Sequence, residues 1–485
     1  MSIIALPVAE LKPALSGLGK IIGRKSSLPI LNHIKVERTA EGWIALSANN
    51  LEQSATVRLE QPAEGNPCSM LIPMEDLQRI TKACSRYDTI TVRSEERASE
   101  ASVIIQYPIG QQQVETKVES LPVEEFPEIP RIAGKPIPVP DTLRISLLQA
   151  LECSSEDETR FVLNGAFIDV SQNSGHYVVG TDGRKLYSSN SFSLPLESSM
   201  IIPSHSFLGW KEFNSDGEWQ LQVHSNDTPV FAISTRRWIY TSKQIEGNYP
   251  NWRQVIPSAD QFKTTVVLDQ EALDSAIQMI QRLPNYDDTN FAIGLKVEKK
   301  RVSLIGRSAQ SERWNEVDLN VRSLRGSDAK IFFNRHTITT ALKFGLNIIE
   351  IIDGISPMRI SSAGRQMIIM PIRASDPPPA PAVEPPASTP AQETPEPEPP
   401  TEERSPMIND TNAGTVPATT SDEPESEIDQ VLEFLEDLRE SLTANLVDLK
   451  GVTAKVRQMK KDRKSTEKEI QSFRQTLASL QRVKL

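Results

Sequence analysis

A weak internal repeat with a period near 130 residues is the feature that most constrains how this chain can fold. Three amphipathic helix candidates begin at residues 7, 141 and 269. Each is followed 32 to 35 residues later by a β-rich run, at 42, 175 and 301, and then by a strand-to-helix step, at 69, 199 and 329. This order at near-constant spacing predicts three similar units in tandem rather than one large core.

Each unit combines two helix candidates with several strand candidates, a pattern typical of an α+β domain with helices on one face of antiparallel sheets. The units are longer than solenoid repeats, so each is interpreted as a domain, with bounds at 1–131, 132–258 and 259–374. We call residues 1–374 the body. Three similar domains in tandem suggest an arc, and two such arcs could close a ring.

The chain changes character after the body. Residues 375–426 carry eleven acids, one base and fourteen of the chain's 35 prolines, without an aromatic residue. Such a segment cannot bury enough apolar surface to offset the entropy lost on ordering. The composition therefore predicts a disordered, proline- and acid-rich linker.

The last segment, residues 427–485, has a seven-residue apolar repeat that predicts a coiled coil, as one helix or a helical hairpin. Asn445 occupies a core position, and Arg463 and Thr466 interrupt the seam. The half up to residue 449 is acidic and the rest is basic, which favours antiparallel pairing within or between chains. Self-association and a basic arm for DNA or another partner both remain open.

Composition and charge restrict the class of protein. The net charge is −11, but the linker carries most of it, and the body is near −3. The sequence contains no run of eighteen apolar residues, so we expect no membrane span, and its first residues lack the pattern of a signal peptide. Three widely spaced cysteines form no CxxC motif, which is typical of a reducing compartment. We expect a cytoplasmic protein.

The chain has no motif for catalysis or cofactor binding. Its five histidines show no metal-binding spacing, and it has neither a phosphate-binding loop nor a nucleophile elbow. The "TDG" at 181–183 follows an apolar strand and is interpreted as a turn in which Asp182 supports the backbone. We therefore expect no enzyme activity, no catalytic residue, no metal and no cofactor.

Six motifs follow one another along the body. In chain order they are "RKSSLPILNHIKVE" (24–37), "ANNLE" (48–52), "RFVLNGAFIDV" (160–170), "VVGTDGRKLYSSN" (178–190), "GNYPNWRQVIP" (247–257) and "MIIMPIR" (367–373). Together they resemble the bacterial DNA polymerase III beta subunit, the ring-shaped DNA sliding clamp. The resemblance implies a head-to-tail homodimer of three-domain subunits, with helices lining the hole and sheets outside. It also implies a non-enzymatic processivity factor for DNA replication, loaded by a clamp loader.

The resemblance also implies three groups of site residues. The DNA-binding set is Lys20, Arg24, Lys25, Arg79 and Lys82. The pocket that would hold a partner's linear peptide, with a glutamine and apolar anchors, comprises Leu163, Thr181, Gly183, Arg184, Leu186, Pro250, Val255, Ile368, Met370, Pro371, Ile372 and Arg373. The dimer contact comprises Thr116, Val118 and Leu283.

Some residues depart from the family's pattern. Arg184 and Lys185 stand where the family usually has His then Arg, and Asn50 replaces the acid of its "TDLE" motif. Partner specificity therefore stays open between a host-chromosomal clamp and a clamp specialised for a phage, plasmid or mobile element. A clamp-like scaffold or decoy, whose coiled coil recruits a partner, is a further alternative. The tail could also regulate the pocket, because "QVLEFL" at 430–435 faintly resembles a clamp-binding peptide.

Overall fold

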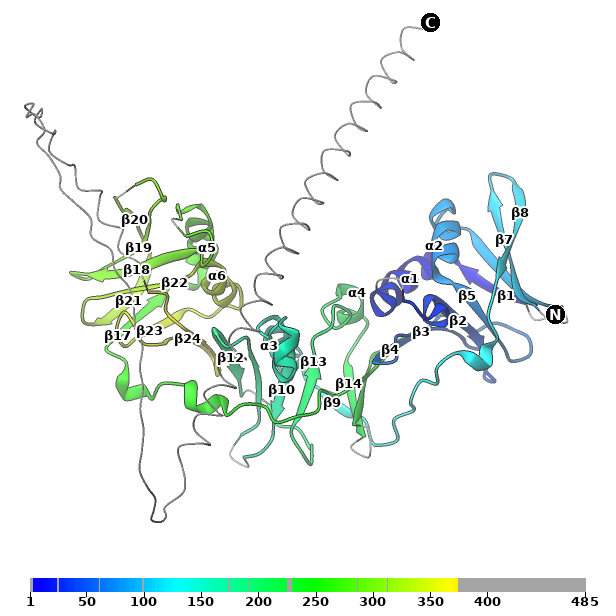
Figure 1. Ribbon diagram of the computed structural model, residues 1–485, viewed down its shortest axis with the longest axis horizontal. Helices are drawn as coiled ribbons and strands as arrows, with labels where there is room; N and C mark the ends of the chain where they lie inside the picture. Colours follow the sequence, from blue (N-terminus) through cyan, green and yellow to red (C-terminus); the bar gives the residue numbers. More distant parts are fainter. Residues whose placement is uncertain are drawn as a thin grey trace, which may run out of the picture. The chain divides into compact units, whose positions relative to one another are not determined.

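The order of helices and strands repeats three times along the body. A computed structural model describes residues 3–23, 26–60, 62–97, 100–172, 175–190, 192–224, 229–285, 287–311 and 313–373. All of them belong to one compact unit, Met1–Val383 (Figure 1). The linker and the coiled coil predicted for 375–485 lie outside the described residues. We call the three repetitions the first, second and third repeat; the domain bounds themselves stay predictions.

The first repeat runs from a strand through a long helix to a second strand-helix step. Its strands are β1 Ile3–Pro7, β2 His33–Arg38, β3 Ile44–Asn49, β4 Gln53–Arg58, β5 Cys68–Pro73, β6 Thr89–Arg97, β7 Glu100–Ile109 and β8 Gln112–Glu119. Its helices are α1 Val8–Ile22 and α2 Met74–Ala83, with short 3-10 turns η1 Pro29–Asn32 and η2 Val123–Glu125. α1 begins one residue after the predicted start at 7, and β5 and α2 form the strand-to-helix step predicted from residue 69.

The second repeat has the same order of elements. Its strands are β9 Ile137–Val139, β10 Gly165–Asp169, β11 Tyr177–Thr181, β12 Lys185–Ser189, β13 Met200–Pro203, β14 Trp219–His224, β15 Val230–Ser234 and β16 Trp238–Lys243. Its helices are α3 Asp141–Glu152 and α4 Lys211–Asn214, with η3 Glu158–Leu163 and η4 Trp252–Val255. The helix predicted after residue 203 is reduced to α4, because the intervening segment buries Phe207 and Trp210 against Trp238 as an irregular aromatic cluster.

The third repeat adds one strand. Its strands are β17 Thr264–Leu268, β18 Ala292–Glu298, β19 Arg301–Gly306, β20 Asn315–Asp318, β21 Val321–Gly326, β22 Ala329–Asn334, β23 Ile348–Ile351, β24 Met358–Ser362 and β25 Arg365–Ile369. Its helices are α5 Leu273–Arg282 and α6 Arg335–Lys343, with η5 Ala259–Gln261 and η6 Gln270–Ala272. Asn334 caps α6 by accepting hydrogen bonds from two backbone amides of its first turn.

The strands form antiparallel sheets that run from one repeat into the next. An eight-stranded sheet has the order β5-β2-β3-β4-β16-β15-β14-β9, and a nine-stranded sheet has the order β13-β10-β11-β12-β25-β24-β23-β17-β21. We call the β4–β16 pairing the first junction and the β12–β25 pairing the second junction. Four-stranded sheets β1-β6-β7-β8 and β20-β19-β18-β22 complete the fold. The predicted α+β class with antiparallel sheets is confirmed.

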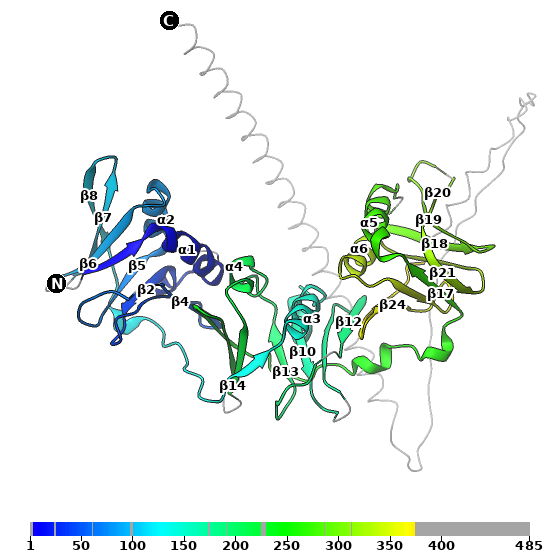
Figure 2. The ribbon, with the colours of Figure 1, turned by 180° about the vertical axis from the view of Figure 1, so that it is seen from behind.

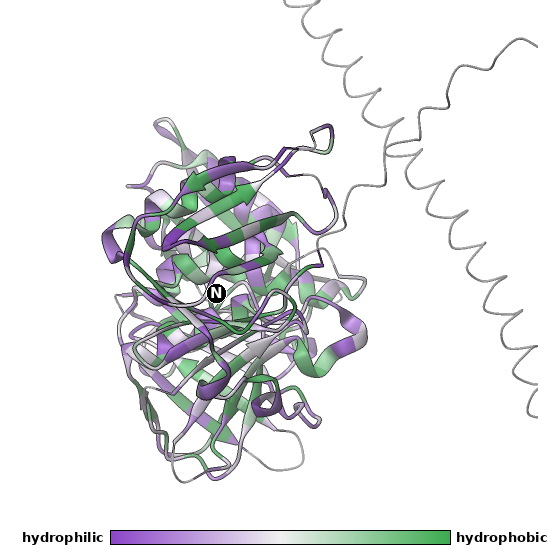
Figure 3. Ribbon diagram, turned by 90° about the vertical axis from the view of Figure 1, so that its left-hand side faces the viewer, coloured by the Kyte–Doolittle hydropathy of each residue, from purple (hydrophilic) through white to green (hydrophobic). Residues whose placement is uncertain are grey.

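Helices cover one face of these sheets (Figure 2). The periodicity of the sequence explains the packing, because α5 buries Leu273, Ala276, Ile277 and Ile280 at helical spacing. Hydrophobic and hydrophilic residues are both present along the helices and strands (Figure 3). Cys68, Cys84 and Cys153 are free thiols, in agreement with the absence of a disulfide pattern in the sequence.

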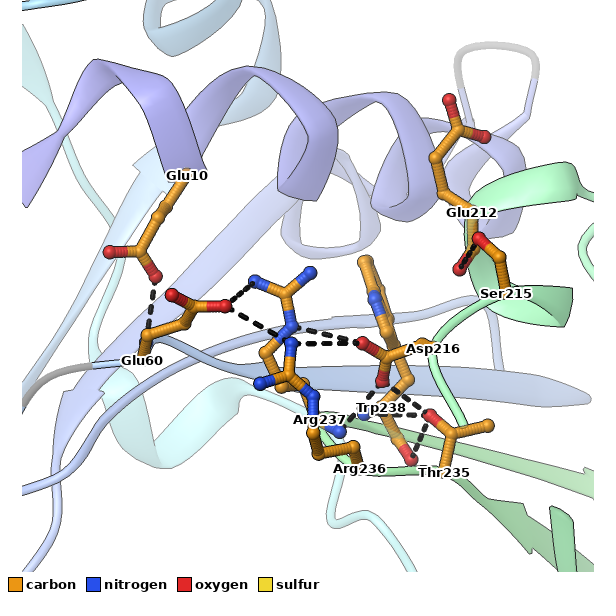
Figure 4. A network of polar contacts seen from close by, with 9 residues as sticks. All are labelled: Glu10, Glu60, Glu212, Ser215, Asp216, Thr235, Arg236, Arg237 and Trp238. Atoms are coloured by element: carbon orange, nitrogen blue, oxygen red, sulfur yellow. Dashed lines mark hydrogen bonds and ion pairs between the residues drawn. The ribbon is translucent and has the colours of Figure 1, made fainter. Parts of the chain in front are cut away.

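A network of polar side chains connects the first and second repeats next to the first junction (Figure 4). Arg237 donates from Nε to the buried carboxylate of Asp216 at 3.0 Å, and its Nη1 lies 3.5 Å from Glu60. Glu60 in turn donates its backbone N–H to Glu10 on α1 at 2.7 Å. The first and second repeats are therefore joined by side chains as well as by strand pairing.

Candidate functional site

A hairpin of the second repeat forms one wall of a cavity at the second junction. The turn between β11 and β12 is held by Asp182, whose Oδ1 accepts from the backbone N–H groups of Arg184 at 2.8 Å and Lys185 at 2.9 Å. Lys185 also places its Nζ 2.6 Å from the same carboxylate. Gly183 adopts φ +85, which a residue without a Cβ tolerates best. The predicted structural role of Asp182 is confirmed.

Strand pairing brings the end of the body against this hairpin. Leu186 on β12 lies directly opposite Ile368 on β25. One step further, Met370 donates its backbone N–H to the carbonyl of Arg184 at 3.0 Å. Segments that are far apart in the sequence therefore meet at a fixed register.

The segment between the second and third repeats closes the other side. Tyr249 stacks on Phe167 with ring centroids 4.6 Å apart, and Trp252 is buried. The Nε1 of Trp252 donates to Asp169 at 2.9 Å, and Arg253 Nη1 donates to the same carboxylate oxygen at 2.5 Å. These contacts fix the position of the wall that contains Pro250 and Val255.

Buried groups in this wall have shifted pKa values. Burial by itself would raise the pKa of Asp169, but hydrogen bonds from Ser171, Trp252 and Arg253 outweigh it, so that the pKa lies below its usual range. Burial raises the pKa of Tyr249, and its phenol stays neutral near pH 7. Asp169 is thus a fixed anionic anchor rather than a proton carrier.

The resulting cavity has a volume of ≈ 230 Å³ and a mainly apolar surface. It is lined by nine residues of the predicted pocket: Leu163, Thr181, Gly183, Arg184, Leu186, Pro250, Val255, Ile368 and Met370. Leu186 and Ile368 form its buried floor, whereas Val255 and Met370 are more than 40% exposed at its mouth. An apolar floor with exposed apolar side chains at the rim suits an apolar peptide anchor.

Sequence reasoning missed four lining residues and included three that do not line the cavity. The missed residues are Lys185, Tyr249, Asn251 and Trp252; all of them stand inside the quoted motifs "VVGTDGRKLYSSN" and "GNYPNWRQVIP". The residues outside the lining are Pro371, Ile372 and Arg373. The backbone N–H of Ile372 donates to the carbonyl of Phe332 on β22 at 2.8 Å, which directs the chain away after Met370.

The predicted DNA-binding residues lie on α1 and α2 as far as they are described. Lys20 is half-buried in the last turn of α1, and Lys82 is exposed in the last turn of α2. Arg79 is exposed but forms an ion pair with Asp76 at 2.7 Å, one turn earlier on the helix. Arg24 and Lys25 lie outside the described residues.

The predicted dimer residues divide between an edge strand and an interior position. Thr116 and Val118 lie on β8, which pairs only with β7 among the described strands. Leu283 follows α5 and is buried, and a side chain at Gly306 on β19 would meet its Cβ. Leu283 therefore packs against β19, the strand next to the edge strand β20.

Two negative findings apply to the described residues. None of the described helices is long and apolar enough to cross a membrane. No group of three or more His, Cys, Asp or Glu side chains in the described part of the chain could hold a metal ion.

Comparison with known proteins connects this architecture with a family. No family model matches the chain. The Beta sliding clamp of Salmonella typhimurium is 25% identical over 380 residues, covering 75% of this chain and 97% of that protein. The Beta sliding clamp of Escherichia coli K12 is 24% identical over 384 residues, with the same coverage. Among solved structures, the beta subunit from the DNA polymerase of Streptococcus pyogenes superposes with a TM-score of 0.66 at 19% identity, covering 77% of this chain and 100% of its own.

The body has the fold of the beta sliding clamps. The Bacillus subtilis DNA polymerase sliding clamp gives the same TM-score of 0.66 at 18% identity, over 99% of its own chain. The recognised resemblance of residues 1–374 is therefore confirmed at the level of fold and of relatedness to beta sliding clamps. These relatives cover about three quarters of this chain and nearly all of their own length.

Proposed function

We propose that this protein is a DNA sliding clamp. Two copies of the body close a ring around duplex DNA in the cytoplasm, and the cavity at the second junction tethers a DNA polymerase and other replication or repair factors. A clamp loader places the ring on DNA. The protein itself acts as a processivity factor and performs no chemical step.

The cavity at the second junction is the observation that carries the proposal. Its floor is built from Leu186 and Ile368, and its walls come from two repeats and the segment between them. A partner that docks a short peptide there would bind the clamp without touching the DNA face. Such binding tethers the partner while leaving it free to work along the duplex.

The sheet order supports ring closure. The last strand of the second repeat pairs with β4, and the last strand of the third repeat pairs with β12. Two strands at equivalent positions have no such partner among the described strands. They are β8, which ends the first repeat as β16 and β25 end the others, and β20, which has the place of β4 and β12 in the third repeat. Each pairs on one side only among the described strands. Pairing β8 of one copy with β20 of another would repeat the same junction and protect both edges.

The basic residues of α1 and α2 support non-specific attraction to phosphate. A clamp must hold DNA without reading its sequence, which favours long-range charge over base contacts. Lys20 and Lys82 lie in the last turns of α1 and α2. The two helices pack closely, since a Cβ added at Gly19 on α1 would contact Met74 and Gln78 on α2. The ion pair of Arg79 with Asp76 lowers its contribution.

A topological retention experiment tests the proposal. The full chain would be loaded onto nicked circular plasmid with a bacterial clamp loader and ATP, and then separated from free protein by gel filtration. We expect it to stay with the circle and to be released when a restriction enzyme linearises the plasmid. Equal retention on circular and linearised DNA, or retention on neither, would contradict the sliding-clamp proposal.

A peptide-binding experiment tests the pocket separately. The probe is a fluorescent peptide with one glutamine and leucine and phenylalanine anchors. We expect Leu186→Ser to weaken its binding at least tenfold, because the variant places a hydroxyl in the apolar floor. Leu46→Ser, at a buried position of the first repeat, is the matched control for general destabilisation. Equal effects of the two substitutions would argue against docking at this cavity.

A further inference from the structure

The first junction holds a second cavity, which the proposed tethering function does not use. Its volume is ≈ 720 Å³, and its lining includes Asn49, Ser54, Arg131, Thr241 and Lys243. It occupies the same place relative to β4 and β16 as the apolar cavity occupies relative to β12 and β25. We call it the first-junction cleft.

The hairpin turns that wall the two cavities are built alike. Asn50 Oδ1 accepts from the backbone N–H groups of Glu52 at 3.1 Å and Gln53 at 2.7 Å. Asp182 Oδ1 accepts in the same way from the second and third residues after it, at 2.8 and 2.9 Å. The replacement of an acid by Asn50, which the sequence shows as a departure from the family, therefore preserves this turn.

The strand that closes each cavity also makes the same backbone contact. Lys243 donates its N–H to the carbonyl of Glu52 at 3.1 Å, and Met370 donates to the carbonyl of Arg184 at 3.0 Å. Glu52 and Arg184 occupy the same position in their turns. Lys243 and Met370 are therefore structurally equivalent, although one is charged and the other is apolar.

The register identifies the residues that replace the apolar floor. Leu186 lies opposite Ile368 at the second junction, and Ser54 lies opposite Thr241 at the first. In both pairs, the hairpin residue is the second of its strand. Where the cavity at the second junction presents two aliphatic side chains, the first-junction cleft thus presents two hydroxyl groups.

These hydroxyl groups determine what the cleft can bind. Ser54 and Thr241 are each less than 5% exposed, and both line the cleft. A hydroxyl in the floor of a cleft can donate to or accept from a polar group of a ligand, whereas an apolar group placed against it would leave the hydroxyl without a partner. Lys243 and Glu52, 3.1 Å apart, add a charged pair to the rim.

We propose that the first-junction cleft is a second docking site, which binds an extended peptide segment of a partner protein through polar anchors with hydroxyl or amide side chains. The shared turn, closing contact and register argue for a peptide, and the hydroxyl floor argues for polar anchors. The cleft is large enough for several residues. The inference rests on the proposed function, because it assumes that the equivalent cavity at the second junction binds a peptide.

A lining-exchange experiment tests whether the cleft can hold a peptide. The variant Ser54→Leu/Thr241→Ile/Lys243→Met gives the cleft the side chains of the second junction. The probe is the fluorescent apolar peptide used above, titrated into the full chain. We expect two bound peptides per chain instead of one, and one when Leu186→Ser is added. A variant that melts as a folded protein and still binds one peptide would overturn the proposal.

A selection experiment tests the preference for polar anchors. Phage-displayed random dodecapeptides would be selected on the full chain carrying Leu186→Ser, and the winners synthesised with a fluorophore. We expect peptides whose binding weakens at least tenfold with Thr241→Val or Ser54→Ala and is unchanged when Leu186 is restored. Selection of no peptide sensitive to Thr241→Val would overturn the inference. The proposed function would stand if the apolar peptide still bound the wild-type chain in a Leu186-dependent manner.

Discussion

Trp252 donates a hydrogen bond from its indole nitrogen to the buried carboxylate of Asp169, at 2.9 Å. Arg253 donates to the same oxygen, and its guanidinium lies 4.4 Å from the centroid of the Trp252 ring. One carboxylate thus holds two consecutive residues of the segment that walls the cavity at the second junction. The geometry of that cavity depends on an acid that does not line it.

Removing this carboxylate should weaken both the fold and the pocket. We expect Asp169→Ala to lower the free energy of unfolding by about 2–3 kcal/mol, because it leaves the Trp252 and Arg253 donors without their acceptor. Trp252→Phe removes one of these bonds and should cost less. Urea denaturation measures stability, and the fluorescent apolar peptide measures affinity. Unchanged stability and affinity in Asp169→Ala would contradict the anchoring role.

His205 should make stability depend on pH. Burial, followed by the nearby charge of Lys20, lowers its pKa to about 4. Its Nδ1 also accepts from the backbone N–H of Phe207, which requires an unprotonated nitrogen. The unfolded chain binds a proton near pH 6.5, so its contribution is complete above that pH and is lost as pH falls toward 4.

We therefore expect the melting temperature to fall between pH 7 and pH 5, and to fall less steeply in His205→Gln. Thermal melts in buffers of equal ionic strength would measure this. His33, whose pKa is also lowered chiefly by burial, leaves a residual slope in the variant. An identical slope in wild type and His205→Gln would rule out His205 as a source.

Glycine should be the favoured residue at the same position of both equivalent turns. Leu51 has φ +77, and Gly183, at the same place in the other hairpin, has φ +85. A left-handed residue with a Cβ costs about 1–2 kcal/mol, and a glycine loses about 0.5–1 kcal/mol in entropy. Leu51→Gly should therefore stabilise the chain by about 0.5–1 kcal/mol, whereas Gly183→Leu should destabilise it. Denaturant midpoints would show this, and shifts of the same sign would disprove the equivalence.

The sequence predicts the helix that opens each repeat and the order of helices and strands, because local periodicity indicates both; α5 begins at Leu273, four residues after the predicted start at 269. The "TDG" turn was also predictable, since Asp and Gly have defined roles in turns. The likeness of the two junction turns was not, because Asn50 and Leu51 share no side chain with Asp182 and Gly183. It becomes visible only through hydrogen bonds and backbone angles.

The differences between the predicted and the observed lining of the cavity at the second junction have similar causes. Tyr249 and Trp252 stand in a quoted motif, but only the fold shows that they face the cavity. Pro371 was included because the apolar run continues past Met370, whereas a backbone hydrogen bond after it redirects the chain. The pairing of Arg79 with Asp76, in contrast, follows from their spacing on a helix and could have been predicted.

The last prediction concerns ring closure through the edge strands β8 and β20. Glu316 is an exposed residue of β20, and its backbone N–H faces away from β19, because Leu319, three residues further on, donates its own N–H to Val302 on β19. Proline at this position removes an outward N–H that a further strand would use, so Glu316→Pro should open the contact with β8 of a second copy. Lys117→Pro on β8 should do the same from the other side. Glu316→Thr removes the same carboxylate but keeps the N–H, and serves as the control.

The half-life on nicked circular DNA is the appropriate measurement, because the predicted coiled coil could hold two copies together even with an open ring. We expect both proline variants to leave the circle several-fold faster than Glu316→Thr, while melting near the wild-type temperature. If they melt normally and stay on the circle as long as the control, β8 and β20 do not close the ring, and the dimer must form through another surface.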